Sequence, residues 1–120
     1  MIIRGRVIRG DQKAAKTGFP TSNLKAELVK NKINKGVYAA QAEYGKKIHQ
    51  AILVYGAKNK QNKAKLEIFI LNFHQNLYKK IIRVRILNKI RSIMEFKNVR
   101  ELKKQIVKDI KKAKRILNAA

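Results

Sequence analysis

The spacing of the apolar residues changes once along the chain, and this change most strongly limits the possible folds. In the first three quarters, apolar residues form short segments bounded by glycine or polar turns, at 2–9, 37–44, 48–55, 66–73 and 81–90. Segments of this length and spacing are typical of β-strands. From residue 99 onward, apolar residues recur instead at intervals of three and four, which is the pattern of one face of an amphipathic helix.

The connections between these segments indicate how they pair. Gly45-Lys46-Lys47 joins two apolar segments and predicts a hairpin, whereas 11–24 and 56–64 are expected to be loops. Residues 25–35 are expected to form a loop or one short helical turn. Asn98 is suited to cap the helix, with Glu101 three residues on. We therefore predict five or six strands in a small closed or nearly closed antiparallel β-barrel over about 1–92, followed by a helix over about 98–118.

Length and composition limit the class of protein. A chain of 120 residues fits a single domain over 1–120, and no apolar run approaches the roughly 20 residues of a membrane span. The first residues contain no apolar block of the kind found in a signal peptide. There is no cysteine, which excludes disulfides and thiolate chemistry. We expect a cytoplasmic protein without a membrane partner, acting as a monomer.

The net charge of +23, from 30 Lys and Arg against 7 Asp and Glu, has three interpretations. It would suit a nucleic-acid-binding protein. It would equally be a solvated surface without a partner, or a field that concentrates a small polyanion such as ATP. Charge alone does not separate these alternatives. The few aromatic residues lie mostly within apolar segments, which makes nucleic acid the less favoured partner.

Glu67 is the acid whose position in the pattern is unusual. Side chains alternate between the two faces of a strand, so in 66–73 Glu67 shares a face with Phe69, Leu71 and Phe73. An isolated carboxylate in apolar surroundings is costly, and enzymes use such groups as general bases. The alternative is that Glu67 lies at the end of its strand, in solvent or beside one of the many cations.

Other motifs constrain the chemistry less. His49 and His74 are too few and too far apart in the pattern for a convincing metal site, and the chain contains no P-loop. The turn Pro20-Thr21-Ser22-Asn23 offers hard oxygen ligands that suit Mg²⁺ and phosphate. An ordinary turn stabilised by side-chain bonds to the backbone explains the same residues.

Taken together, these residues resemble the ATP-dependent riboflavin kinase family, the flavokinase module of bacterial bifunctional FAD synthetases. The resemblance covers nearly the whole chain. Gly18-Phe19-Pro20-Thr21-Ser22-Asn23 is similar to the family signature G-[FI]-P-T-A-N, with Ser22 in place of alanine. The stretch 67–78 is similar to E-x-H-I-x-x-F-x-x-x-[LF]-Y. The two motifs at this spacing are fairly specific, whereas neither would be so alone.

The resemblance implies a six-stranded antiparallel Greek-key barrel with a C-terminal helix. It implies transfer of the ATP γ-phosphate to the terminal ribityl hydroxyl of riboflavin, with Glu67 as catalytic base and a stand-alone domain without adenylyltransferase activity. The metal would be Mg²⁺, with Zn²⁺ or Mn²⁺ as alternatives, at Thr21 and Asn23. The residues implied in ATP binding are Gly10, Lys16, Gly18, Pro20, Thr21 and Asn23. Those implied in flavin binding are Arg91, Phe96 and Asp109.

Several positions depart from the family pattern and leave two other functions open. Ala14 and Ala15 stand where a glycine and an arginine are usual, and Lys79 replaces a glycine. Loss of the glycine narrows the conformations of the loop, and a lysine elsewhere does not replace an arginine fork. A flavin-binding relative with weakened catalysis is therefore one alternative. A basic β-barrel module that binds nucleic acid is the other.

Overall fold

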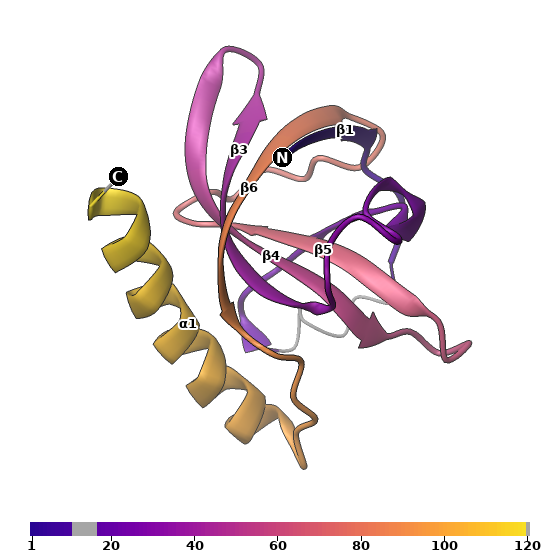
Figure 1. Cartoon of the computed structure of the whole chain (residues 1–120), viewed down its shortest axis with the longest axis vertical. Coiled ribbons are helices and arrows are strands. Elements are labelled where there is room, and N and C mark those ends of the chain that lie inside the picture. Colours follow the sequence, from indigo (N-terminus) through magenta and orange to yellow (C-terminus); the bar gives the residue numbers. More distant parts are fainter. Residues whose placement is uncertain (11–16, 120) are drawn as a thin grey trace.

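The computed structural model describes residues 1–10 and 17–119. Six strands form one antiparallel sheet in the order β1-β6-β3-β4-β5-β2 (Figure 1). The strands are β1 (Ile2–Arg6), β2 (Ser22–Leu24), β3 (Gly36–Tyr44), β4 (Lys47–Lys58), β5 (Ala64–Ile70) and β6 (Ile81–Arg91). A 3₁₀ turn, η2 (Ala26–Leu28), follows β2, and the helix α1 (Val99–Ala119) follows β6.

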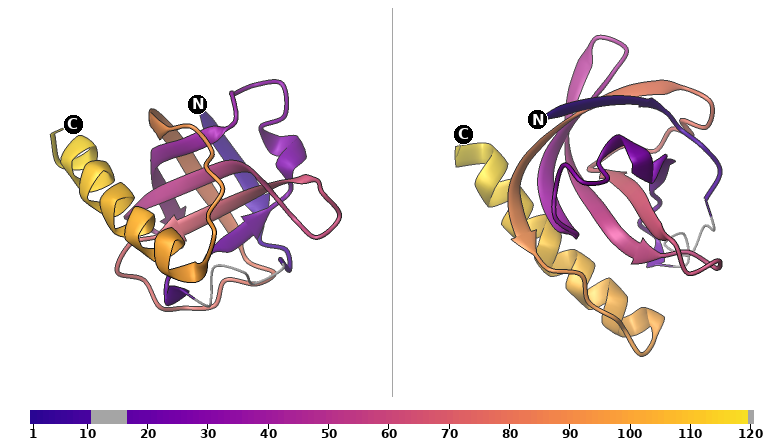
Figure 2. Two further views of the ribbon diagram at one scale, coloured as in Figure 1. Left: turned by 90° about the horizontal axis from the view of Figure 1, so that it is seen from below. Right: turned by 45° about the vertical axis from the view of Figure 1, so that its right-hand side comes forward.

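The sheet curls so far that its two edges come into contact through one isolated bridge. The backbone N–H of Ile8, just after β1, donates to the carbonyl of Asn23 in β2 over 2.8 Å. Figure 2 shows the resulting half-open barrel, with α1 lying along its outer surface. The predicted fold, a mainly β barrel with a C-terminal amphipathic helix, is confirmed.

Two apolar clusters occupy the two faces of the sheet. Inside the barrel, the largest fully buried side chains include Leu53, Leu66 and Ile68. On the outer face, a second cluster joins the sheet to Ala113 and Leu117 of α1. Because strand side chains alternate, β3, β4, β5 and β6 contribute to both clusters, whereas the described residues of β1 and β2 contribute to the inner one.

Several predicted boundaries were wrong, among them the strand predicted over 2–9, which ends at Arg6. Residues 22–24 were predicted within a loop but form β2. A strand of three residues is too short to show a period in a sequence, so it was missed. The loop predicted at 56–64 begins later, since β4 continues to Lys58. The strand predicted over 66–73 ends at Ile70, and Asn72 adopts a left-handed φ of 53°. Phe73 therefore packs against the inner cluster and does not share the face of Glu67.

The start of α1 follows the predicted capping pattern. The side-chain Oδ1 of Asn98 accepts a hydrogen bond of 2.9 Å from the N–H of Glu101. This bond satisfies one of the free N–H groups in the first turn. The carboxylate of Glu101 lies 3.9 Å from the ammonium of Lys104 on the helix surface. The cap fixes where the chain leaves the 92–98 segment and turns along the sheet.

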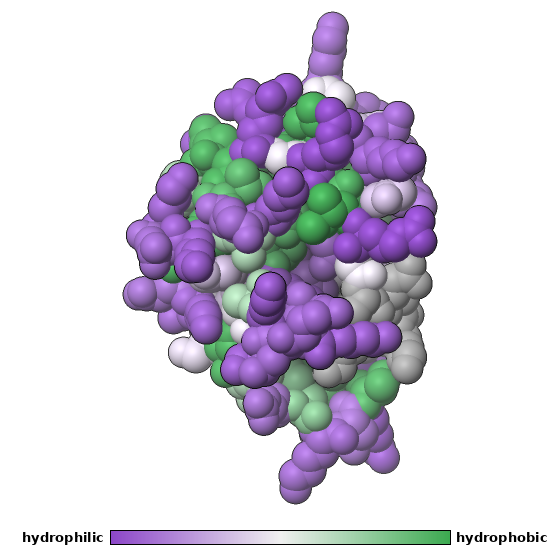
Figure 3. Space-filling view, turned by 90° about the vertical axis from the view of Figure 1, so that its right-hand side faces the viewer, coloured by the Kyte–Doolittle hydropathy of each residue, from purple (hydrophilic) through white to green (hydrophobic). Residues whose placement is uncertain are grey.

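One face of the molecule is predominantly hydrophilic (Figure 3). On the face shown in Figure 3, polar and charged side chains project outward and apolar groups form separate patches between them. Over the described ranges 1–10 and 17–119, no helix has both the length and the apolar content to cross a membrane.

Candidate active site

Glu67 and Thr21 meet at the edge of the sheet. In the pairing of β2 with β5, Asn23 lies directly opposite Glu67. The hydroxyl of Thr21 donates a hydrogen bond of 2.9 Å to Oε2 of Glu67, across 46 positions of sequence. The proline-containing turn and the acid singled out in the sequence are therefore parts of one site.

The carboxylate of Glu67 is buried but not isolated. Only 7% of the residue is exposed, and Phe69, two residues along the same strand face, packs edge-on against Phe19 at 5.5 Å between ring centroids. The ammonium of Lys65 lies 3.5 Å from Oε1 of Glu67. Of the two interpretations of the sequence, burial among apolar groups holds for the residue as a whole, and the alternative of a neighbouring cation also holds. The carboxylate therefore has two polar partners, a hydroxyl donor and an ammonium group.

Sequence reasoning missed Lys65. The signal was present, because residues two apart on a strand share a face and Lys65 precedes Glu67 by two. In a chain with 30 basic residues, however, the sequence alone does not distinguish Lys65 from the others. Burial distinguishes it, since 9% of its side chain is exposed.

A pocket of about 920 Å³ adjoins this edge of the sheet. Gly10 and Asn23 contribute to its wall, together with Lys25, Lys60, Lys63 and Lys65. A Cβ atom at Gly10 would overlap the side-chain amide of Asn23, so only glycine lets the backbone lie this close. The lining is rich in ammonium groups, which suits a ligand carrying several negative charges.

The remaining predicted nucleotide contacts lie in the turn that leads into β2. Gly18 has a φ of +81°, a left-handed conformation that favours glycine. The N–H of Phe19 donates to the hydroxyl of the buried Thr17 over 3.2 Å, and the exposed Pro20 follows. Lys16 lies outside the described residues. The structure thus brings Gly10, Thr21 and Asn23 together around Glu67, with Gly18 and Pro20 shaping the approach.

The three residues predicted to contact a flavin form a second cluster. Arg91, at the end of β6, donates from Nε and Nη2 to both carboxylate oxygens of Asp109, over 2.9 and 2.8 Å. Gln105, one turn earlier on α1, donates to the same carboxylate over 3.0 Å. The guanidinium carbon of Arg91 lies 5.9 Å from the ring centre of Phe96. These contacts fix the 92–98 segment between the sheet and the helix.

The two clusters lie at opposite ends of one row across the outer face. Following the strand pairings, Asn23 is opposite Glu67, Glu67 is opposite Val54, Val54 is opposite Val37, and Val37 is opposite Arg91. Glu67 and Arg91 are thus three strand spacings apart, or roughly 14 Å. Of the two valines between them, Val37 is fully buried in the cluster that packs against α1 and Val54 is partly buried, so apolar packing connects the two ends of the row.

The residues around Thr21 suit a hard divalent cation. No cluster of three or more His, Asp or Glu side chains able to hold a metal occurs within 1–10 and 17–119. A cation at this edge would depend on neutral oxygens, such as the Thr21 hydroxyl and the Asn23 amide, and on oxygens of a bound phosphate. Mg²⁺ is commonly held in this way, through few protein ligands plus phosphate and water.

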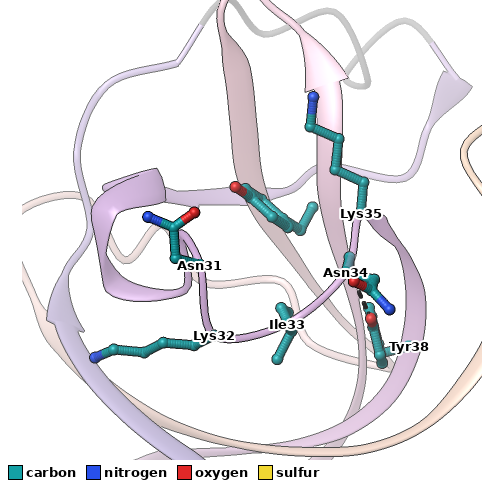
Figure 4. Close-up of a pocket in the computed structure, with 7 residues that line it drawn as sticks. Asn31, Lys32, Ile33, Asn34, Lys35 and Tyr38 are labelled. Carbon is teal, nitrogen blue, oxygen red and sulfur yellow. Dashed lines mark hydrogen bonds between the residues drawn. The ribbon is translucent and has the colours of Figure 1, made fainter.

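A second pocket, of about 560 Å³, lies on the opposite face of the sheet (Figure 4). Its wall includes Tyr38 and Tyr55, which belong to the inner apolar cluster. The hydroxyl of Tyr38 donates to the carbonyl of Asn34 over 2.6 Å, and burial raises the pKa of this phenol. Glu67 faces the other way, so this pocket is not part of the candidate site.

The chain resembles known proteins along almost its whole length. The family model described as "Flavokinase: Riboflavin kinase" matches residues 1–117. The chain is 37% identical over 112 residues to an RNA-binding riboflavin kinase of Bacillus subtilis, covering 91% of this chain and 48% of that protein. It is 34% identical over 120 residues to a bifunctional riboflavin kinase/FMN adenylyltransferase of Haemophilus influenzae, covering 98% and 39% respectively.

A solved riboflavin kinase from Trypanosoma brucei shares the fold. It superposes with a TM-score of 0.68 at 20% identity, covering 98% of this chain and 79% of that one. The chain spans less than half the length of the two bacterial relatives. Because the family model matches almost every residue of it, the chain belongs to the riboflavin kinase family.

Proposed function

We propose that this protein is a riboflavin kinase, which transfers the γ-phosphate of ATP to the terminal ribityl hydroxyl of riboflavin and yields FMN and ADP. One observation carries the proposal. Thr21 holds the buried carboxylate of Glu67 through a hydrogen bond, and the two neighbours of that carboxylate, Asn23 and Lys65, line the adjoining cation-rich pocket. Phosphoryl transfer needs this combination of a base, positive charge and fixed geometry.

Glu67 is the catalytic base in this proposal. Its carboxylate accepts the proton of the ribityl hydroxyl as that oxygen bonds to the γ-phosphorus and the bond from phosphorus to the leaving ADP oxygen breaks. Thr21 holds the carboxylate in one orientation through the 2.9 Å hydrogen bond, and its hydroxyl oxygen keeps lone pairs for a cation.

The nucleotide occupies the pocket beside Gly10 and Asn23. Thr21 and Asn23 hold a divalent ion, for which Mg²⁺ is the preferred choice and Zn²⁺ or Mn²⁺ the alternatives. When bound, this ion neutralises charge on the phosphates. Gly10, Gly18 and Pro20 shape the backbone around the phosphates, and Lys16 contributes a charge. ATP as donor also implies the cytoplasm as the site of action, and we expect a monomer.

The flavin ring lies at the β6–α1 end of the row, against the Arg91 cluster. Asp109 holds the guanidinium of Arg91 in place, and Phe96 offers an aromatic face nearby. The ribityl chain then extends along the row toward Glu67, because that carboxylate lies at the other end of the same row.

Incubation with riboflavin, ATP and Mg²⁺, followed by chromatography, tests this function. We expect FMN and ADP to appear in equal amounts. Flavin binding without FMN would identify a relative with weakened catalysis. Absence of both flavin binding and FMN would contradict the proposal.

A second candidate function rests on a separate surface, which we call the arginine face. Arg4 in β1 lies directly opposite Arg83 in β6, with Arg6 and Arg85 along the same two strands. Like charges in opposed positions destabilise a sheet, and Glu43 of β3, opposite Arg83 on its other side, offsets only one of these charges. A polyanionic partner would neutralise the remaining ones. The exposed ring of Tyr78 lies beyond this face, with the Arg9 guanidinium 5.2 Å from its centre. The name of the Bacillus subtilis relative also includes RNA binding.

Fluorescence anisotropy with a labelled single-stranded RNA tests this candidate. Replacing Arg4 and Arg83 with Gln should weaken binding far more than replacing Lys103 and Lys104 on α1, which removes the same charge. Equal losses from the two double variants, or binding that does not fall with salt, would exclude a specific face.

A further inference from the structure

Lys65 belongs to both halves of the candidate site. Its ammonium lies 3.5 Å from Oε1 of Glu67, and its side chain contributes to the wall of the pocket that also contains Gly10 and Asn23. Burying an ammonium group costs free energy unless an opposite charge or hydrogen-bond acceptors compensate it. Lys65 is 9% exposed at its side chain, whereas Lys60 and Lys63 on the same pocket wall are exposed.

The contact with Glu67 is weaker than an ion pair that serves structure alone. The Arg91–Asp109 pair shows what the same fold builds for that purpose, with two hydrogen bonds of 2.8 and 2.9 Å. At 3.5 Å, Lys65 and Glu67 are attracted by charge without a short hydrogen bond. Because Lys65 also lines the pocket, an anion bound there can compete with Glu67 for its charge.

We propose that Lys65 is a phosphate-binding residue of the kinase, which moves from Glu67 to the terminal phosphates of ATP when the nucleotide enters the pocket. This inference rests on the proposed function. The move has two consequences. It places a positive charge beside the phosphoryl group being transferred, and it frees Oε1 of Glu67 to accept the hydrogen bond of the ribityl hydroxyl.

The chemistry of the step is unchanged by this assignment. The oxygen of the ribityl hydroxyl bonds to the γ-phosphorus, the bond to the bridging oxygen of ADP breaks, and the proton passes to Glu67. Lys65 stays protonated throughout and neutralises charge on the phosphate oxygens. A flexible lysine suits this role, because its ammonium is a point charge on a long stem that can change partner without moving the backbone.

Nucleotide affinity, measured by calorimetry for ATP, ADP and AMP with Mg²⁺, tests the proposal. Lys65→Met should weaken ATP binding about tenfold or more, the effect of losing one charge-assisted hydrogen bond. AMP binding should change little, because AMP lacks the terminal phosphates. Lys65→Arg should recover most of the ATP affinity. Lys63→Met is the matched control, since it removes the same charge from an exposed position on the same pocket wall.

The outcomes separate Lys65 from the proposed function. If Lys65→Met lowers kcat but leaves ATP, ADP and AMP affinities as in the wild type, Lys65 only positions Glu67 and the proposal fails. If Lys65→Met and Lys63→Met weaken ATP equally, the effect is general electrostatics and the proposal also fails, while FMN formation by the wild type would still support the kinase. A wild type that forms no FMN and binds no ATP would overturn both. Melting temperatures of the three variants check that each is folded.

Discussion

The two ends of the outer-face row hold their charged groups in different ways. At the β6–α1 end, the carboxylate of Asp109 accepts two bonds from Arg91 and a third from Gln105, all of 3.0 Å or less. At the β2–β5 end, Glu67 has one short bond, from Thr21, and an ammonium at 3.5 Å. Both carboxylates are at least nine-tenths buried.

This difference indicates which end is scaffold and which end reacts. A carboxylate held by both arms of a planar guanidinium is fixed in one geometry and has little room for another partner. Among the described residues, the second oxygen of Glu67 has one long ionic contact, which leaves capacity for a further partner. We infer that the Asp109 cluster fixes a binding surface, and that Glu67 exchanges partners during turnover.

The largest expected effect comes from removing the base. Glu67→Gln keeps the size of the side chain and one acceptor oxygen but cannot accept the proton, so kcat should fall about 10²-fold or more. Steady-state FMN formation measures this. Glu43→Gln, on the same outer face of β3, is the control and should leave kcat unchanged. Near-wild-type turnover in Glu67→Gln would remove Glu67 from the base role.

Removing the charge of Asp109 should lower both the stability of the protein and its affinity for riboflavin. Asp109→Asn leaves the partly buried Arg91 guanidinium without its counter-charge. We expect a loss of about 2 kcal/mol in the free energy of unfolding, less than for a fully buried pair because Arg91 is partly exposed. Denaturant unfolding measures this loss, and fluorescence titration with riboflavin should show weaker binding.

The exposed pair of Glu101 and Lys104 provides the comparison for Asp109→Asn. Glu101→Gln should change stability by less than about 0.5 kcal/mol and leave flavin binding intact. If both variants lose the same stability, the Arg91–Asp109 pair has no special structural role.

A smaller effect is expected at the nucleotide pocket. Gly10→Ala places a methyl group where the Asn23 amide now lies, so Asn23 must move and the KM for ATP should rise roughly tenfold. Riboflavin affinity should be unchanged. Because the change acts through Asn23, adding Gly10→Ala to Asn23→Ala should have little further effect. Full additivity of the two changes would show that Gly10 acts independently of Asn23.

The smallest effect on the protein is expected at Lys79, which lies outside both ends of the outer-face row. Lys79 stands where the family usually has glycine, and its φ of 71° is left-handed. Lys79→Gly should relieve this conformation and raise the free energy of unfolding by about 0.5–1 kcal/mol. Kinetic constants should not change, so this variant shows whether stability alone alters activity. A drop in melting temperature would contradict the account of this turn.

Several parts of this site were predictable from the sequence, for physical reasons. The helix start was clear because Asn98 supplies a cap just before a strong three-and-four periodicity. The face of Glu67 followed from strand alternation up to the left-handed turn at Asn72. The resemblance to a family supplied Thr21 and Arg91 as site residues.

Other parts were not predictable, because they depend on contacts between distant segments. Strand β2 has only three residues and exists through its pairing with β5. The pairing of Arg91 with Asp109 depends on how α1 crosses β6, which no local pattern specifies. The role of Lys65 emerges only from its burial beside Glu67.

Amide chemical shifts of the labelled protein would test most directly whether two substrates share one sheet face. Mg²⁺ with ADP should shift residues around Gly10, Asn23 and Lys65, and riboflavin should shift 91–96 and the α1 turn around Asp109. Both ligands together should add changes around Glu67, where the two sets meet. If riboflavin instead shifts residues around Tyr38 and Tyr55 on the inner face, or if both ligands shift one common set, the central claim is wrong.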